Sequence, residues 1–210
     1  MSGVESDPAK RLTAVPGVQR LPKRALDLFT LRHWLSPADC ASLCATIDAD
    51  RRPSTIADDQ GIVAFRTSET CDLDSSDPLV RTIRERLSKL VGIPLGHAEP
   101  LQGQRYTAGQ EFRPHTDTFN PDGADYYLHC AEAGQRSWTA MIYLNRPADG
   151  GATRFKVIGK TIHPETGKLL LWNNLRPDGS PNPATLHQGM KVRKGCKYVL
   201  TAWFRERPLG

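Results

Sequence analysis

The sequence predicts an α+β fold that is mainly β, in which two or three N-terminal helices buttress a C-terminal β-barrel. Two helix signatures occur before residue 100. After Pro100 the texture changes to short apolar or alternating runs separated by Gly, Pro, Asn and Asp. Many short strands without helices between them indicate a sandwich or barrel, and not a parallel α/β sheet. The 210 residues are enough for one such domain.

The first 20 residues are expected to form a flexible leader. They are polar, contain Pro8 and Pro16, and show neither helical nor strand periodicity. The remainder, 21–210, is predicted to be a single domain.

Two helices are expected in the N-terminal half. Ser36 can cap the first helix and Pro37 can open it, which predicts a helix over about 37–49. Asp77 and Pro78 repeat this arrangement at SDPLVRTIRERLSKLVG, where apolar residues recur at helical spacing. Between the two helices we expect a loop and then a short strand at 62–67.

Six segments after Pro100 are predicted to be strands. Each is apolar or alternating and is bounded by turn residues. They are LQGQRYT, SWTAMIYLN, ATRFKVI, GKLLLW, ATLHQG and KYVLTAWF.

Composition excludes several classes of protein. No apolar run approaches the roughly 20 residues of a membrane span. The net charge of +5 and the pI near 9.0 permit an acidic partner, but no window holds the run of like charges of a nucleic-acid-binding tail. Five cysteines without a CxxC pair, together with the lack of an apolar signal region, predict a cytoplasmic protein without a disulfide framework.

One spacing suggests a metal site. His115 and Asp117 in FRPHTDTF are two residues apart, so on a strand they would project from the same face. His187 in ATLHQG is the best candidate for a third ligand. Two histidines and one carboxylate form the facial triad of non-haem iron oxygenases. The alternative is that His115 and Asp117 are a simple surface pair.

Two residues near these candidates suggest an anionic ligand. Lys197 begins an otherwise apolar strand ten residues after His187, and a buried lysine needs a counter-charge. Tyr106, nine residues before His115, has a hydroxyl that can donate to the same anion. The alternatives are a lysine that points to solvent and an ordinary core tyrosine.

At this point the sequence resembles prolyl 4-hydroxylase-like Fe(II)/2-oxoglutarate dioxygenases. The resemblance covers about residues 60–206, with a catalytic core at about 99–206. It implies a double-stranded β-helix, which is a jelly-roll or cupin-like barrel. The motifs that carry it are RTS at 66–68, RYTAGQEFRPHTD, GQRSWTAMIYLN, GGATRF, GKLLLWNN and DGSPNPATLHQGMKVRKGCKYVLTAWFR.

The resemblance also implies roles for single residues. Fe(II) would be held by His115, Asp117 and His187, and no further catalytic acid or base is required. Lys197 and Tyr106 would bind the far carboxylate of 2-oxoglutarate, and the same pocket would be lined by Thr153 and Trp203. Substrate contacts are expected from Arg136 and Arg66, and from Tyr127 if the loop NPDGADYY acts as a lid.

The implied activity is hydroxylation of an unactivated C–H bond with O2, releasing succinate and CO2 and depending on L-ascorbate. The expected substrate is a prolyl residue in a peptide or protein, as in procollagen-proline 4-dioxygenases. A free amino acid or other small molecule is the alternative, to be distinguished by the shape of the groove. A nucleic-acid demethylase is disfavoured because Phe204 stands where its first arginine is expected. A non-catalytic metal or 2-oxoglutarate sensor is disfavoured because a structural metal site has no need of a nearby buried lysine.

Overall fold

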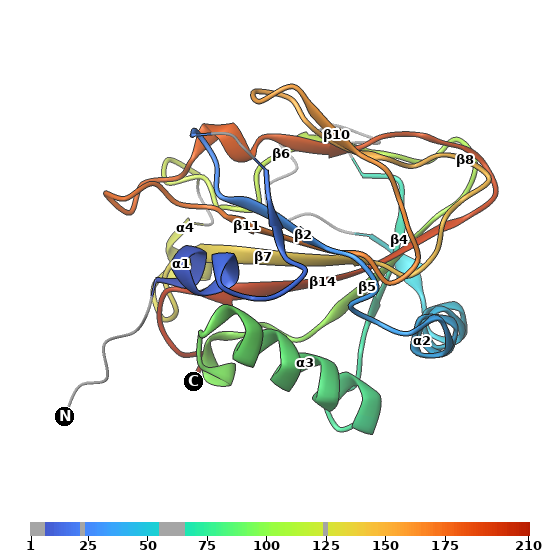
Figure 1. Ribbon diagram of the computed structural model, residues 1–210, viewed down its shortest axis with the longest axis horizontal. Coiled ribbons are helices and arrows are strands. Elements are labelled where there is room, and N and C mark those ends of the chain that lie inside the picture. Colours follow the sequence, from blue (N-terminus) through green and yellow to red (C-terminus); the bar gives the residue numbers. More distant parts are fainter. Residues whose placement is uncertain (1–6, 22–23, 55–65, 124–125) are drawn as a thin grey trace.

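The computed structural model describes residues 7–21, 24–54, 66–123 and 126–210. Two antiparallel sheets face each other, and helices α1 and α3 cover the outer face of the larger sheet (Figure 1). This arrangement confirms the predicted mainly β fold with N-terminal helices.

The larger sheet has eight strands in the order β1-β2-β11-β7-β14-β5-β4-β3. Its strands are β1 (Gln19–Arg20), β2 (Leu28–Leu31), β3 (Arg52–Pro53), β4 (Glu69–Asp72), β5 (Gln102–Tyr106), β7 (Arg136–Tyr143), β11 (Leu169–Asn173) and β14 (Lys197–Arg205).

The smaller sheet has four strands in the order β10-β9-β12-β6, and β8 pairs separately with β13. These strands are β6 (Phe112–His115), β8 (Asp149–Gly150), β9 (Thr153–Phe155), β10 (Lys160–Ile162), β12 (His187–Gly189) and β13 (Val192–Lys194). The helices are α1 (Pro8–Thr13), α2 (Pro37–Ala49), α3 (Pro78–Val91) and α4 (Tyr126–Cys130), with 3-10 turns η1 (Leu95–His97) and η2 (Pro183–Thr185).

Both faces of the larger sheet are buried, and successive side chains along each strand point to opposite faces. In β7, Ala140 and Ile142 belong to the core under the helices, whereas Met141 and Tyr143 belong to the core between the sheets. The side chains between the two sheets include the candidate site residue Tyr106. The candidate site is thus built on the inner faces of the sandwich.

The local signals of both long helices are confirmed. The first spans Pro37–Ala49, and the Ser36 hydroxyl accepts a hydrogen bond from the Asp39 amide at 3.1 Å. The second begins at Pro78 after the Asp77 cap and ends at Gly92, whose φ of 77° suits glycine. All six predicted segments after Pro100 contain a strand. The strand predicted at 62–67 lies almost wholly outside the described residues, and only Arg66 of it forms a bridge that is described, with Phe112.

The flexible leader predicted over 1–20 is wrong from Pro8 onward. Pro8 opens α1 after the Asp7 cap, and Leu12 is completely buried against the helical core. The guanidinium of Arg11 donates to the carbonyl of Lys89 in α3 at 2.9 and 3.1 Å. A six-residue helix is too short to show helical periodicity in the sequence. Proline usually interrupts a helix, but at the first helical position, where Pro8 lies, it is favourable.

We expect Leu12→Ala to lower the free energy of unfolding by about 2–5 kcal/mol, because it leaves a cavity between α1 and α3. Lys10→Ala in the exposed face of the same helix is the control and should change stability by less than about 0.5 kcal/mol. Urea denaturation of the two variants measures this difference. Equal effects of both substitutions would show that α1 is not docked.

No helix among the described residues is long and apolar enough to cross a membrane.

Candidate metal centre

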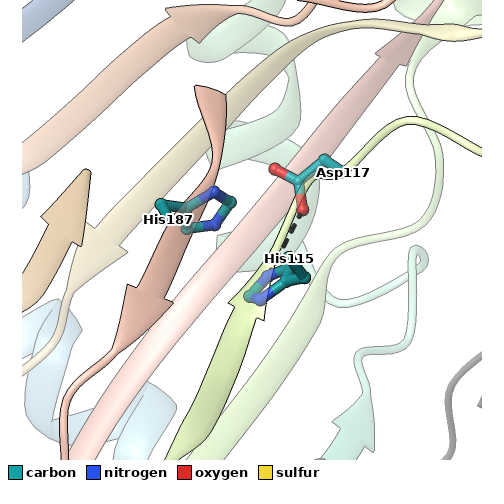
Figure 2. Close-up of side chains that lie close together, drawn as sticks. All are labelled: His115, Asp117 and His187. Atoms are coloured by element: carbon teal, nitrogen blue, oxygen red, sulfur yellow. Dashed lines mark ion pairs between the residues drawn. The ribbon is translucent and has the colours of Figure 1, made fainter. Parts of the chain in front are cut away.

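Two histidines and one aspartate meet on the smaller sheet (Figure 2). His115 ends β6, His187 begins β12, and the two residues are direct partners in the antiparallel pair. Asp117 follows two residues after the end of β6, so it lies beyond the strand on which the sequence placed it. One possible ligand atom from each residue lies within 4.8 Å of the others. His115 Nε2 and Asp117 Oδ1 are 3.9 Å apart.

Both imidazoles are oriented by backbone carbonyls. His115 Nδ1 lies 2.7 Å from the carbonyl of Arg113, and His187 Nδ1 lies 2.8 Å from the carbonyl of Thr185. A carbonyl oxygen only accepts, so each Nδ1 carries the proton and donates. Each Nε2 therefore keeps its lone pair for a metal ion, which is the usual arrangement of a metal-binding histidine.

Asp117 is oriented through a chain of two hydrogen bonds. Asn174 Nδ2 donates to Thr139 Oγ1 at 2.8 Å, and the Thr139 hydroxyl donates to Asp117 Oδ2 at 2.7 Å. All three side chains are buried. This leaves Oδ1, the oxygen nearer His115, for a metal ion.

The electrostatics favour the metal-binding protonation states. Burial and the neighbouring His187 lower the pKa of His115 to about 3, so its imidazole is neutral. Burial alone would raise the pKa of Asp117, but His187, His115 and the Thr139 hydroxyl outweigh burial and lower it. Two imidazole nitrogens and one carboxylate fit a divalent transition metal and leave coordination positions open.

Lys197 lies in the same cavity as the metal-ligand candidates. It is 3% exposed and, among the described residues, has no hydrogen-bond or ion-pair partner. Its Nζ lies 5.1 Å from the ring centre of Tyr106, its direct partner in the β5–β14 pair, and 5.5 Å from that of Tyr143. Burial lowers the pKa of Lys197 to about 7. Such a cation lacks the counter-charge that an anionic ligand can supply.

The cavity between the sheets connects these groups. Its empty volume is about 460 Å³, including the part open to solvent, and Thr153 and Tyr106 line it. The hydroxyls of Thr153 and Tyr143 lie within hydrogen-bond distance at 2.7 Å, and the Tyr143 hydroxyl also lies 3.1 Å from the carbonyl of Ile162. Apolar surface is supplied by Trp172, Met141 and Val199.

The structure brings only some of the other predicted site residues to the cavity. Arg66, predicted to contact substrate, and Trp203, predicted to line the 2-oxoglutarate pocket, both line it. Arg136 instead makes two hydrogen bonds of 2.8 Å to Glu99, and its guanidinium stacks 4.0 Å from the Trp203 ring. Tyr127 is 79% exposed on α4, in a segment that the sequence predicted to be a loop, and does not line the cavity. The substrate roles of Arg136 and Tyr127 stay predictions.

Sequence reasoning missed Thr139 and Asn174, which orient Asp117, and also the cavity residues Gln104 and Thr201. Three of these four side chains lie on inward positions of strands. Alternation along SWTAMIYLN could have placed Thr139 inward with Met141. Nothing in the local sequence pairs it with Asp117.

Comparison with known proteins finds a family model and relatives that are similar to this chain. Residues 101–205 match the model of the 2OG-Fe(II) oxygenase superfamily. A putative prolyl 4-hydroxylase of Acanthamoeba polyphaga mimivirus is 30% identical over 186 residues, which cover 85% of this chain and 74% of that protein. Probable prolyl 4-hydroxylase 3 of Arabidopsis thaliana is 29% identical over 199 residues, which cover 83% of this chain and 68% of that protein.

Solved structures share the fold. A viral collagen prolyl hydroxylase from Paramecium Bursaria Chlorella virus-1, determined as a 2OG complex, has a TM-score of 0.67 at 24% identity and covers 85% of this chain and 95% of that chain. A Pseudomonas putida prolyl-4-hydroxylase has a TM-score of 0.61 at 19% identity and covers 94% of this chain and 96% of that chain. These likenesses confirm the predicted double-stranded β-helix.

Proposed function

Because the chain belongs to the 2OG-Fe(II) oxygenase superfamily, as a prolyl 4-hydroxylase-like dioxygenase, we propose that it hydroxylates a prolyl residue of a peptide or protein. The observation that carries the chemistry is one cavity that holds both a His-Asp-His cluster and a buried lysine for which the described residues offer no counter-charge. The substrate class rests on the relatives, which are named prolyl 4-hydroxylases.

The donor set fits Fe(II), and the unpartnered Lys197 fits the far carboxylate of 2-oxoglutarate. When bound, iron and 2-oxoglutarate supply the oxidising chemistry: O2 and 2-oxoglutarate convert a C–H bond to C–OH, and succinate and CO2 are released. The protein's own groups then have only to bind, orient and exclude water.

We assign the metal to His115, Asp117 and His187. Three protein ligands would leave coordination positions of Fe(II) open to the reactants. Lys197 would pair with the far carboxylate, Tyr106 would donate a hydrogen bond to it, and Thr153 would line the same pocket.

We assign Arg66 to the substrate side, and we place Trp203 next to the cosubstrate and the substrate; both residues line the cavity. Arg136 orients Trp203, because its guanidinium stacks on the Trp203 ring and donates two hydrogen bonds to Glu99. Tyr127 stands on the outside of α4, where it can contact a peptide that extends beyond the cavity.

We also propose L-ascorbate as the reductant that returns iron to Fe(II) after turnover without substrate. A cytoplasmic location is consistent with the cysteines, because all five are free thiols.

A small-molecule substrate is the second candidate. The cavity is partly open to solvent, so a free amino acid can enter it as well as the side chain of a peptide.

Succinate release from 2-oxoglutarate under air tests the proposal. Fe(II) and ascorbate are supplied, and the assay is run with proline-rich peptides, with free amino acids and with neither. We expect the peptides to stimulate release. Stimulation by free amino acids alone would support the second candidate. Absence of any release from iron-loaded protein would contradict both and support a sensor.

A further inference from the structure

Gln104 is a buried amide on the wall of the cavity that the assigned roles leave unexplained. It lies on β5 between Gln102 and Tyr106, and because alternate residues share a face it points inward with Tyr106. It is 3% exposed. Its partner in β14 is Val199, one inward position along from the Lys197–Tyr106 pair.

The orientation of this amide is fixed by its neighbours. Gln102 Nε2 donates to the Asp72 carboxylate at 3.2 Å, so Gln102 Oε1 faces the interior. That oxygen accepts from Gln104 Nε2 at 3.1 Å and from Arg66 Nη2 at 3.5 Å. The Thr201 hydroxyl donates to Gln104 Oε1 at 2.9 Å. A carboxylate only accepts and a guanidinium only donates, so the network can run in only one direction.

This network leaves one donor unused. An amide nitrogen carries two N–H groups, and Gln102 takes one of them. The other has no acceptor in the part of the chain that the structure describes. An unused donor on a buried wall is unfavourable, so an acceptor atom of a ligand at this position gains a hydrogen bond.

Arg66 brings a second donor to the same place. Its Nη2 and Gln104 Nε2 share one acceptor, Gln102 Oε1, and so lie close together. The guanidinium stacks 4.9 Å from the Phe112 ring, which in turn stacks 3.5 Å from the ring of the metal-ligand candidate His115. Among the described residues Arg66 has no acidic partner. A charged and a neutral donor thus stand together beside the metal site.

We propose that Gln104 determines substrate specificity by donating its free N–H to a carbonyl-type oxygen of the residue that is hydroxylated. The proposal rests on the proposed function and deepens it. The far carboxylate of 2-oxoglutarate already has Lys197 and Tyr106, so Gln104 is available to the substrate. A peptide carbonyl and the carboxylate of a free amino acid share this chemistry.

Gln104→Leu tests the proposal, because leucine keeps approximate size and removes the donor. We expect the KM for the stimulating peptide to rise about fivefold to tenfold, and the KM for 2-oxoglutarate to change less than about twofold. An unchanged peptide KM would overturn the proposal. A rise confined to 2-oxoglutarate would also overturn it by assigning Gln104 to the cosubstrate.

Thr201 supplies a matched pair of variants for the positioning of the amide. Thr201→Val removes the hydroxyl that donates to Gln104 Oε1 and should raise the KM for the peptide. Thr201→Ser keeps the hydroxyl, so its KM for the peptide should equal that of the wild type. If valine and serine behave alike, the network does not position Gln104. This pair also keeps the proposal testable if Gln104→Leu fails to fold.

A peptide with a thioamide in place of the carbonyl of the target residue identifies the acceptor, because sulfur accepts more weakly than oxygen. Calorimetric titration without oxygen should show weaker binding of this peptide to the wild-type protein, and no such penalty in Gln104→Leu. Equal losses of affinity in the wild type and in Gln104→Leu would contradict the contact.

If wild-type turnover responds only to free amino acids, proline and prolinamide take the place of the peptides. An effect of Gln104→Leu on only one of them then identifies which oxygen accepts the hydrogen bond. If no substrate stimulates wild-type turnover, the proposed function fails together with this inference.

Discussion

Asp117→Ala is expected to lower peptide-stimulated succinate release by at least about a thousandfold. The substitution removes the only carboxylate from the cluster with His115 and His187, and loss of even an outer partner of a metal site costs about 10–100-fold. Binding of Fe(II), measured by anaerobic titration, should weaken in parallel. His115→Ala and His187→Ala should behave in the same way.

Asp122→Ala is the matched control, since Asp122 is an exposed carboxylate five residues further along the chain. It should keep wild-type turnover and metal affinity. Circular dichroism of each variant establishes that the fold survives. Full turnover by folded Asp117→Ala would remove this residue from the metal site.

Lys197→Met is expected to raise the KM for 2-oxoglutarate by about 10- to 100-fold. It removes a charge-assisted contact in a buried site and keeps the volume of the side chain. The same change eliminates a buried cation that has no ion-pair partner in the described part of the chain, so the apo variant should be at least as stable as the wild type. An unaltered KM would show that the carboxylate binds elsewhere.

The pKa of Lys197 also predicts a pH dependence. Only the protonated amine attracts a carboxylate, and burial lowers the pKa of Lys197 to about 7 in the free protein. Affinity for 2-oxoglutarate should therefore be full below pH 7 and fall as the pH rises above it. Lys197→Arg keeps its charge throughout this range, so its affinity should not fall in the same window. Parallel curves for the two proteins would contradict this assignment.

Local patterns predicted those parts of the fold that short-range chemistry determines. Ser36–Pro37 and Asp77–Pro78 mark helix starts through capping, which acts within a few residues. The strands after Pro100 were evident because their turn residues interrupt the apolar runs. The docking of α1 was not evident, because it depends on Leu12 and Arg11 contacting α3, far away in the sequence.

The same distinction between local patterns and long-range packing applies to the candidate site. Spacing in the sequence and the family resemblance predicted the roles of His115, Asp117, His187 and Lys197. Thr139 and Asn174 were not found, since their link to Asp117 joins β7, the end of β11 and the segment after β6. The position of Arg136 against Glu99 likewise follows from long-range packing.

The most direct test of the central claim is mass spectrometry of a proline-containing peptide incubated with the protein, Fe(II), 2-oxoglutarate and O2. We predict that the peptide gains one oxygen atom on proline, with an equal amount of succinate, and that omission of iron or 2-oxoglutarate or the substitution Asp117→Ala abolishes the gain. A peptide that gains oxygen equally with Asp117→Ala, or without 2-oxoglutarate, would contradict the account. So would wild-type protein that binds iron and 2-oxoglutarate but oxidises neither peptides nor free amino acids.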